Sequence, residues 1–205
     1  MSIIDYQELL YAYTNGIFPM AEADGSIYWY APDPRAIIPL DTYKPAKSLR
    51  PVLNKKLFEV RLNTDFEKVI RACSQPRLES PGTWISEDLI QSYTNLHKAG
   101  FAHSVECYQQ EQLVGGLYGV CIGGAFFGES MFSHVSNSSK VAFHYLISLL
   151  REQNFLLLDT QFINDNVKRY GAIEIPKTEY LRILQKAIRV KTAWSSSPFS
   201  HIYMD

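Results

Sequence analysis

The chain has 205 residues, of which 46% are hydrophobic and 13% aromatic, and its 20 Lys and Arg residues nearly balance 21 Asp and Glu residues, for a net charge of −1. This composition excludes an intrinsically disordered chain and predicts one domain, or one domain with a small appended lobe. No apolar stretch reaches the ~18–20 residues of a membrane span, no signal peptide is recognisable, and the three cysteines form no Cys-x-x-Cys pair. We therefore expect a soluble, cytoplasmic protein without disulfides or a thiolate zinc site.

The first part of the chain predicts a small irregular lobe. Residues 5–15 have apolar side chains at helical spacing, and Gly16 is a plausible end for that helix. Prolines then separate two short extended pieces, at 26–30 and 36–40. These features place the lobe at residues 1–56.

Residues 57–205 have the regular pattern of one larger domain. The first predicted elements are a strand at 58–62, a helix to Cys73 that Thr64 and Glu67 open as a capping box, and a helix from Ser86 to Ala99. Three strands joined by tight turns follow, at 101–108, 113–122 and 125–132. The last predicted elements are a helix at 137–152, a strand buried on both faces at 155–158, a short helix at 164–170 and a longer helix from Thr178. This order is that of the GNAT-type acyltransferase fold. We expect an α+β domain with a mixed, mostly antiparallel sheet flanked by helices.

Polar residues interrupt two of the apolar strands. Asp159 and Gln161 follow a run of leucines, and strand periodicity places both on one face at the strand's end. Glu129 lies within the apolar stretch 126–132. A buried carboxylate needs a partner. Asp159 therefore either caps a turn or orients an amide in a cleft, and Glu129 either forms a buried salt bridge or recognises a cationic or amine group.

Two segments are rich in basic residues. Residues 43–61 contain six basic residues and one acid, and residues 177–191 contain five basic residues and one acid. Either segment is a solvated face or a contact surface for a phosphate-bearing partner. By contrast, the sequence has no phosphate-binding loop, dinucleotide fingerprint, nucleophile elbow or metal-ligand histidine spacing.

Six motifs follow one another along the chain. They are Asn15–Pro19, Trp29–Ala36, Gly82–Ile85, Gly115–Val120, Phe127–Ser133 and Leu158–Gln161. Together they resemble the leucyl/phenylalanyl-tRNA–protein transferase family, over about residues 9 to 181. Two positions depart from the family's usual pattern, which has Trp in place of Met20 and commonly Arg in place of His134.

The resemblance implies an aminoacyltransferase. Such an enzyme moves Leu or Phe, and also Met, from aminoacyl-tRNA to the N-terminal Arg or Lys of acceptor proteins, which marks them for N-degron proteolysis. It needs no cofactor, metal or ATP. Two alternatives stay open: transfer of Leu to N-terminal Asp or Glu, and a non-catalytic module that binds charged tRNA or N-terminal peptides.

The resemblance also implies roles for individual residues. The expected catalytic residues are Asp159, Gln161 and Glu129. We expect Asp159 to hold and polarise Gln161, which accepts a hydrogen bond from the attacking amine while the proton leaves towards Asp159. Glu129 would hold the acceptor's cationic side chain or the donor's α-ammonium. Trp84 would stack near the terminal adenosine. The other expected substrate-binding residues are Tyr13, Leu117, Met131, Phe143, Leu146, Leu150 and Leu158. The expected contacts to the tRNA acceptor stem are Lys44, Lys47, Arg50, Lys55 and Lys56.

Overall fold

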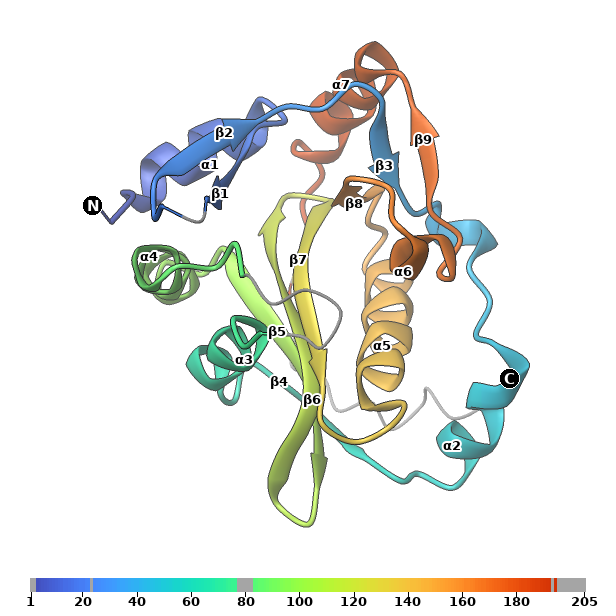
Figure 1. The fold of residues 1–205 in the computed structure, drawn as a ribbon. Coiled ribbons are helices and arrows are strands. Elements are labelled where there is room, and N and C mark those ends of the chain that lie inside the picture. Colours follow the sequence, from blue (N-terminus) through green and yellow to red (C-terminus); the bar gives the residue numbers. More distant parts are fainter. Residues whose placement is uncertain (1–2, 23, 77–82, 193, 195–205) are drawn as a thin grey trace.

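A seven-stranded sheet lies at the centre of the computed structural model (Figure 1), which describes residues 3–22, 24–76, 83–192 and 194. The strands are β1 (Phe18–Ala21), β2 (Ile27–Tyr30), β3 (Arg35–Ile37), β4 (Glu59–Leu62), β5 (Ala102–Gln109), β6 (Gln112–Ile122), β7 (Ala125–Ser133), β8 (Leu157–Gln161) and β9 (Ile173–Ile175). The helices are α1 (Tyr6–Thr14), α2 (Arg50–Asn54), α3 (Phe66–Cys73), α4 (Glu87–Lys98), α5 (Ser138–Glu152), α6 (Asp165–Lys168) and α7 (Lys177–Ala187), with short 3-10 turns η1 (Leu40–Thr42) and η2 (Lys47–Leu49). The large sheet has the order β4-β5-β6-β7-β8-β3-β9, and β1 and β2 form a separate hairpin.

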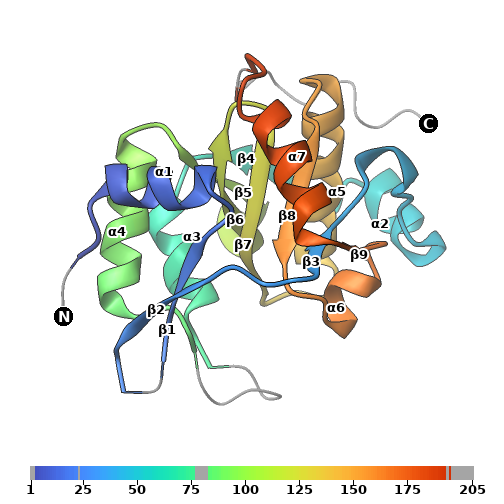
Figure 2. The same cartoon turned by 90° about the horizontal axis from the view of Figure 1, so that it is seen from above.

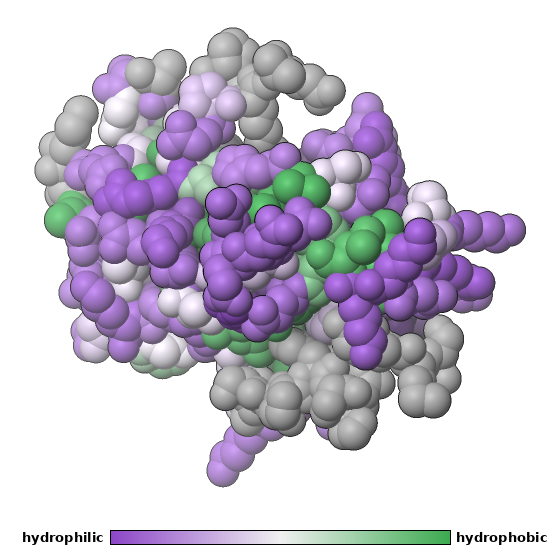
Figure 3. Space-filling view, turned by 90° about the horizontal axis from the view of Figure 1, so that it is seen from below, coloured by the Kyte–Doolittle hydropathy of each residue, from purple (hydrophilic) through white to green (hydrophobic). Residues whose placement is uncertain are grey.

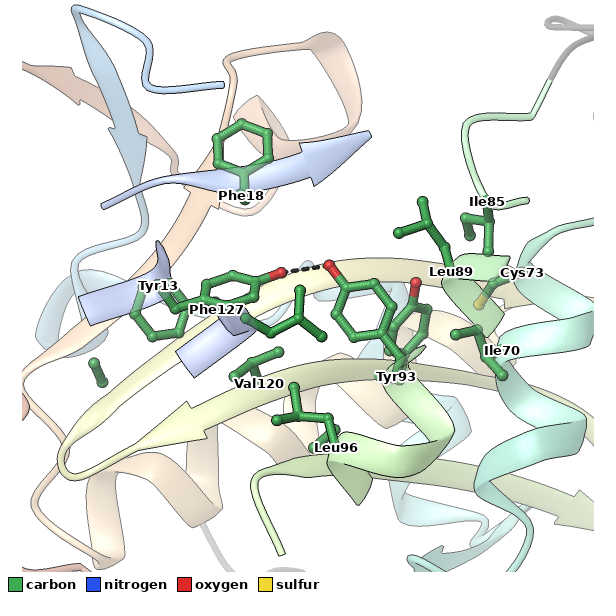
Figure 4. Packing of buried hydrophobic residues seen from close by; sticks show 14 of the residues in the cluster. Tyr13, Phe18, Ile70, Cys73, Ile85, Leu89, Tyr93, Leu96, Val120 and Phe127 are labelled. Carbon is green, nitrogen blue, oxygen red and sulfur yellow. Dashed lines mark hydrogen bonds between the residues drawn. The ribbon is translucent and has the colours of Figure 1, made fainter. Parts of the chain in front are cut away.

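Helices cover both faces of this sheet, so its central strands are buried on both sides. α1, α3 and α4 lie on one side of the molecule, and α5 and α2 on the other (Figures 1 and 2). Neighbouring strand residues therefore enter different cores: Phe127 packs with Tyr13 and Tyr93 on the first side (Figure 4), while Phe126 packs with the α5 side chains on the second. This double burial explains why β6 and β7 read as nearly continuous apolar runs.

β7 and β8 part shortly after they begin. They are the one parallel pair among the described strands, and only three residue pairs join them, the last being Phe127 with Asp159. β7 also has a bulge beyond this point, because Gly119 faces Gly128 while Tyr118 faces Ser130. Glu129 is the extra residue of that bulge. The strands therefore open as a fork, with Glu129 on one arm and Gln161 on the other.

The prediction of an α+β domain, with a mixed and mostly antiparallel sheet flanked by helices, is confirmed. The predicted helices at 5–15, 86–99 and 137–152 and the three consecutive strands are also present, within one to two residues. β1, β9 and α2 were not predicted. β3 lies in the large sheet between β8 and β9, although it precedes residue 56, and the domain boundary stays a prediction.

Two local predictions are wrong. α3 begins at Phe66 without a side-chain cap, because the main-chain N–H groups of Thr64 and Asp65 donate to the Glu106 carboxylate at 3.2 and 3.0 Å. The Glu106 carboxylate is fully buried and needs such donors. Its contacts with these N–H groups take the place of the expected capping box. The strand predicted at 155–158 begins at Leu157, and the preceding Leu156 is 52% exposed.

Candidate active site

Asp159, in the middle of β8, is fully buried and accepts hydrogen bonds from three residues of the chain. Arg35 donates to it from Nε and Nη2, at 3.0 and 2.7 Å. The Tyr180 hydroxyl, from α7, donates at 2.6 Å, and the main-chain N–H of Gln161 donates at 2.8 Å. The carboxylate is thus neutralised by one guanidinium and surrounded by donors, which is the condition for burying a charge.

Arg35 is the residue of this candidate site that sequence reasoning missed. It is 1% exposed, its guanidinium lies 4.7 and 4.6 Å from the ring centroids of Phe18 and Tyr180, and its Nη1 donates to the main-chain oxygen of Gly16 at 2.9 Å. A signal was available, because Arg35 opens a short apolar segment and a buried cation needs a buried anion. Its partner, Asp159, is 124 residues away.

Glu129 has a different environment. Its carboxylate is 8% exposed and accepts hydrogen bonds from the Tyr13 hydroxyl at 2.7 Å, Gln161 Nε2 at 3.0 Å and the Tyr93 hydroxyl at 3.4 Å. The two tyrosine hydroxyls are themselves 2.5 Å apart (Figure 4). None of the described Lys or Arg residues forms an ion pair with it. Burial, only partly offset by the bonds from Tyr13 and Gln161, raises the pKa of Glu129 to about 7.

Gln161 connects the two carboxylates. Its backbone is left-handed, with φ +64°, and the bond from its N–H to Asp159 holds this conformation. Its side chain points to Glu129 instead, so the contact between Asp159 and Gln161 is made by the main chain. Within the described residues nothing donates to the Gln161 amide oxygen. The arrangement offers this free acceptor beside a titratable carboxylate.

The predicted donor-pocket residues come together on the opposite face of the fork. They all belong to the core between the sheet and α5, namely Leu117, Met131, Phe143, Leu146, Leu150 and Leu158. Two aromatic residues that were not predicted join them. The Phe143 ring lies 5.5 Å from the Tyr43 ring and 4.1 Å from the Tyr170 ring, and the Tyr170 hydroxyl lies 3.8 Å from Met131 Sδ.

Other predicted residues lie around this centre. Tyr13 contacts Glu129 directly. Trp84 is half-buried, and its main-chain oxygen accepts a hydrogen bond from Ala21 of β1 at 3.0 Å. Gly82, the first residue of its motif, lies outside the described residues. Met20 pairs with Tyr28 across the β1–β2 hairpin. A surface cavity of about 420 Å³ between α3 and α4 is lined by none of the predicted site residues.

The basic residues expected to contact tRNA are all exposed, on the segment that runs from η1 to the two residues after α2. Long hydrophilic side chains project on the side of the molecule where α2 lies (Figure 3). Arg61, at the end of the same basic segment, is not available, because it pairs with Glu59 and Glu111 and lies over the Tyr108 ring. Over the described ranges there is no cluster of His, Cys, Asp and Glu side chains that could hold a metal ion.

Comparisons with known proteins decide the family. The family model described as "Leucyl/phenylalanyl-tRNA protein transferase" matches residues 37–185, and the model for the N-terminal domain of the same family matches residues 4–33. The chain belongs to the leucyl/phenylalanyl-tRNA–protein transferase family. This confirms the resemblance and the prediction of an aminoacyltransferase.

Relatives in this family match almost end to end. The leucyl/phenylalanyl-tRNA–protein transferase of Chlorobaculum tepidum is 48% identical over 94% of this chain and 100% of the relative. That of Gloeobacter violaceus is 51% identical over 88% of this chain and 92% of the relative. A solved structure, of L-PGS from Bacillus licheniformis, matches with a TM-score of 0.40 and 16% identity, covering 82% of this chain and 56% of that one. No helix of this transferase, within the residues described, is long and apolar enough to cross a membrane.

Proposed function

We propose that the chain transfers Leu or Phe, and also Met, from aminoacyl-tRNA to the α-amine of proteins that begin with Arg or Lys, marking them for N-degron proteolysis. The observation that carries the proposal is the buried Glu129 carboxylate, which has no ion-pair partner among the described residues and lies beside the free amide oxygen of Gln161. An unpaired buried carboxylate favours a cationic acceptor and disfavours N-terminal Asp or Glu. The fork between β7 and β8, beside antiparallel β4 to β7, further supports a GNAT-like arrangement.

The reaction is the aminolysis of an activated ester. The acceptor nitrogen attacks the carbonyl carbon of the aminoacyl ester, a C–N bond forms, and the bond from that carbon to the tRNA ribose oxygen breaks. The amine loses a proton, and the leaving oxygen gains one. Because an α-amine has a pKa of ~7.7–8.0, part of it is neutral near pH 7. Positioning the two reactants accounts for much of the rate.

The contacts favour Glu129, rather than Asp159, as the proton's destination. Asp159 already accepts hydrogen bonds from Arg35, Tyr180 and the main chain of Gln161. Glu129 has a pKa of about 7, so it can take up a proton near neutral pH. In this proposal Gln161 accepts a hydrogen bond from the amine at its free oxygen, Glu129 takes the proton, and Asp159 fixes the backbone of Gln161.

The donor's side chain would occupy the apolar core between the fork and α5. Phe143, Met131 and Leu158 belong to this core. A pocket of this kind accepts Leu, Phe and Met and excludes the β-branched Ile and Val by crowding. Since one methylene is worth only ~1–3 kcal/mol, this discrimination is incomplete.

The donor's tRNA would lie against the exposed basic residues between η1 and α2. Cations on such a surface read phosphate positions and helix shape rather than base sequence, so selectivity rests with the amino-acid pocket. Charged tRNA is a cytoplasmic substrate, which supports the same location for the reaction.

A transfer assay tests the proposal. The purified protein is mixed with radiolabelled Phe-tRNA or Leu-tRNA and an acceptor protein that begins with Arg, beside N-acetylated and Asp-initiated versions of the same acceptor. Label on the free Arg terminus alone is the expected result. Label on the Asp terminus would select the alternative transfer to acidic N-termini. Binding of tRNA without any transfer would identify a non-catalytic module.

A further inference from the structure

The outer side of α7 carries a row of exposed cations. Tyr180, Leu184 and Ala187 form the buried side of the helix. Arg182 and Lys186 are four residues apart on α7 and both exposed, so they lie on one side of the helix. Exposed Arg189 lies in the turn after the helix, where its N–H donates to the Lys186 main-chain oxygen at 3.3 Å, and it extends the row past the helix end. We call Arg182, Lys186 and Arg189 the α7 row.

The α7 row is not neutralised by the protein itself. No ion pair joins any of its members to an acid in the described part of the chain. On α3, by contrast, Lys68 pairs with Asp65, and Arg71 pairs with Glu67 and Glu87. The charge of the α7 row is therefore free to meet a partner.

The row has a fixed position relative to the active site. On the inner side of α7, the Tyr180 hydroxyl donates to Asp159 at 2.6 Å. At the end of the helix, the Gly124 N–H donates to the Ala187 oxygen at 2.8 Å. The row is about one helix diameter, ~10–12 Å, from the Asp159 side. A large substrate whose reactive end enters the site must have its body near this surface.

The α7 row lies next to a segment of opposite charge. The inner side of α7 packs into the same core as α1, and Gln185 Nε2 donates to the Thr14 main-chain oxygen at 3.2 Å, so α7 lies between α1 and α5 (Figure 2). The α1 and hairpin segment, residues 3–34, contains five acids and no Lys, Arg or His. Tyr13, which bonds Glu129, comes from this acidic segment. A basic acceptor terminus is attracted to this acidic segment, and a polyanion to the α7 row.

We propose that the α7 row is a second contact surface for the donor, which binds backbone phosphates of the tRNA beyond its aminoacylated end. The inference rests on the proposed function, because that function makes tRNA the donor. Every donor has the same phosphate backbone, so a fixed row of cations serves all of them. Acceptors share only a basic N-terminus, which the row repels.

Neutralising the row tests the proposal. The variant combines Arg182→Gln, Lys186→Gln and Arg189→Gln, and the matched control combines Lys68→Gln, Arg71→Gln and Lys98→Gln, which changes the net charge equally on the α3 and α4 side. Both are compared with the unmodified protein for transfer from Phe-tRNA and from 3′-O-phenylalanyl-adenosine, which has no phosphate backbone. Direct binding of Phe-tRNA is measured by fluorescence over a series of salt concentrations.

The row variant should raise KM and Kd for Phe-tRNA at least about fivefold at ~0.15 M salt and reduce the slope of log Kd against log salt by about 2–3. KM for phenylalanyl-adenosine and for the acceptor should not change, and the control variant should behave like the unmodified protein. Unchanged tRNA binding, an equal effect of the control, or a change in acceptor KM instead would overturn the proposal. Failure of the proposed function is distinct, because the unmodified protein would then transfer from neither donor.

Discussion

Glu129 and Asp159 are two buried carboxylates, one on each arm of the same fork, and their neighbours give them different chemistry. Arg35 compensates the charge of Asp159 at 2.7 Å. Glu129 has only hydroxyl and amide donors within hydrogen-bond distance, and its pKa rises to about 7 because it is buried. Two carboxylates with such separate environments are suited to separate roles, one holding structure and the other exchanging a proton.

Glu129→Gln should lower kcat by about 100-fold or more, because it removes the group that takes the amine's proton. The ionised form is the active one, so kcat/KM of the unmodified protein should fall as the pH drops below about 7. In the variant, kcat/KM should no longer fall because of a group with a pKa near 7, and it should keep only the pH dependence that the acceptor amine causes. The measurement is kcat/KM against pH with Arg-initiated acceptor. If kcat/KM of the variant still falls below about pH 7 as in the unmodified protein, Glu129 is not the origin of that fall.

The same substitution should stabilise the fold at high pH. A carboxyl whose pKa is higher in the folded protein than in the unfolded chain stabilises the fold fully below the unfolded pKa, near 4.5, and loses this contribution as the pH rises through about 7. Glu129→Gln should therefore raise the free energy of unfolding by about 1–3 kcal/mol at pH 8. Near pH 4.5 the two proteins should be equally stable. Urea unfolding at both pH values makes the comparison, and equal stability at pH 8 would mean that burial of Glu129 carries no penalty.

Arg35→Met should cost about 3–5 kcal/mol of stability, because it leaves the Asp159 charge buried without its partner. Combining it with Asp159→Leu removes both charges and should restore most of that loss. The double variant should still be inactive, since the Gln161 N–H loses the carboxylate that holds it. Chemical denaturation and the transfer assay together test this. If the double variant is as unstable as Arg35→Met, the ion pair is not the origin of the loss.

At the scale of elements, the sequence predicts what local patterns encode. β5, β6 and β7 are long and joined by turn residues, and Ser86 caps α4 as expected, with its side chain accepting from the Leu89 N–H. β1 and β9, of four and three residues, were not predicted, and each is formed by pairing with a neighbouring strand. The helix α2, of five residues, was not predicted either.

In the candidate active site, too, some residues could be predicted from local sequence and others could not. Glu129 and Asp159 were predictable because each is a charge within an apolar strand. Their partners Arg35, Tyr180 and Tyr93 come from distant parts of the chain, and only the folded structure brings them together. The β7 bulge also has no local signature, although it is what places Glu129 at the fork.

The bulge makes a prediction about two glycines. A Cβ at Gly119 would lie 2.3 Å from the Phe127 oxygen and 2.5 Å from the Phe126 ring, so Gly119→Ala must push β7 away from β6. We expect a loss of about 2 kcal/mol or more, as for other overpacked sites. At Gly128 the nearest contact would be 3.5 Å, so Gly128→Ala is the matched control and should fold with unchanged stability. Urea unfolding separates the two, and equal losses would contradict the close packing at Gly119.

At the scale of the whole molecule, the sheet separates two cores that both border the fork. The first core, with Tyr13 and Tyr93, borders Glu129, and the second, with Phe143 and Leu158, lies below α5. The sheet is continuous except where β7 and β8 part, so the fork is the place where groups from the two sides can meet.

This division predicts that tRNA affinity and amino-acid preference can be changed independently. Lys44→Gln, Lys47→Gln and Lys55→Gln together should raise KM for both Leu-tRNA and Phe-tRNA and reduce their salt dependence, because exposed cations contact phosphates that both donors share. The ratio of kcat/KM for the two donors should stay the same. Phe143→Ala should do the reverse, shifting that ratio by about tenfold or more through the pocket while leaving the salt dependence intact. Competition between the two charged tRNAs at several salt concentrations measures both quantities. If the lysine variant changed the ratio, the basic segment would be reading more than phosphates; if Phe143→Ala left it unchanged, the donor's side chain would bind elsewhere.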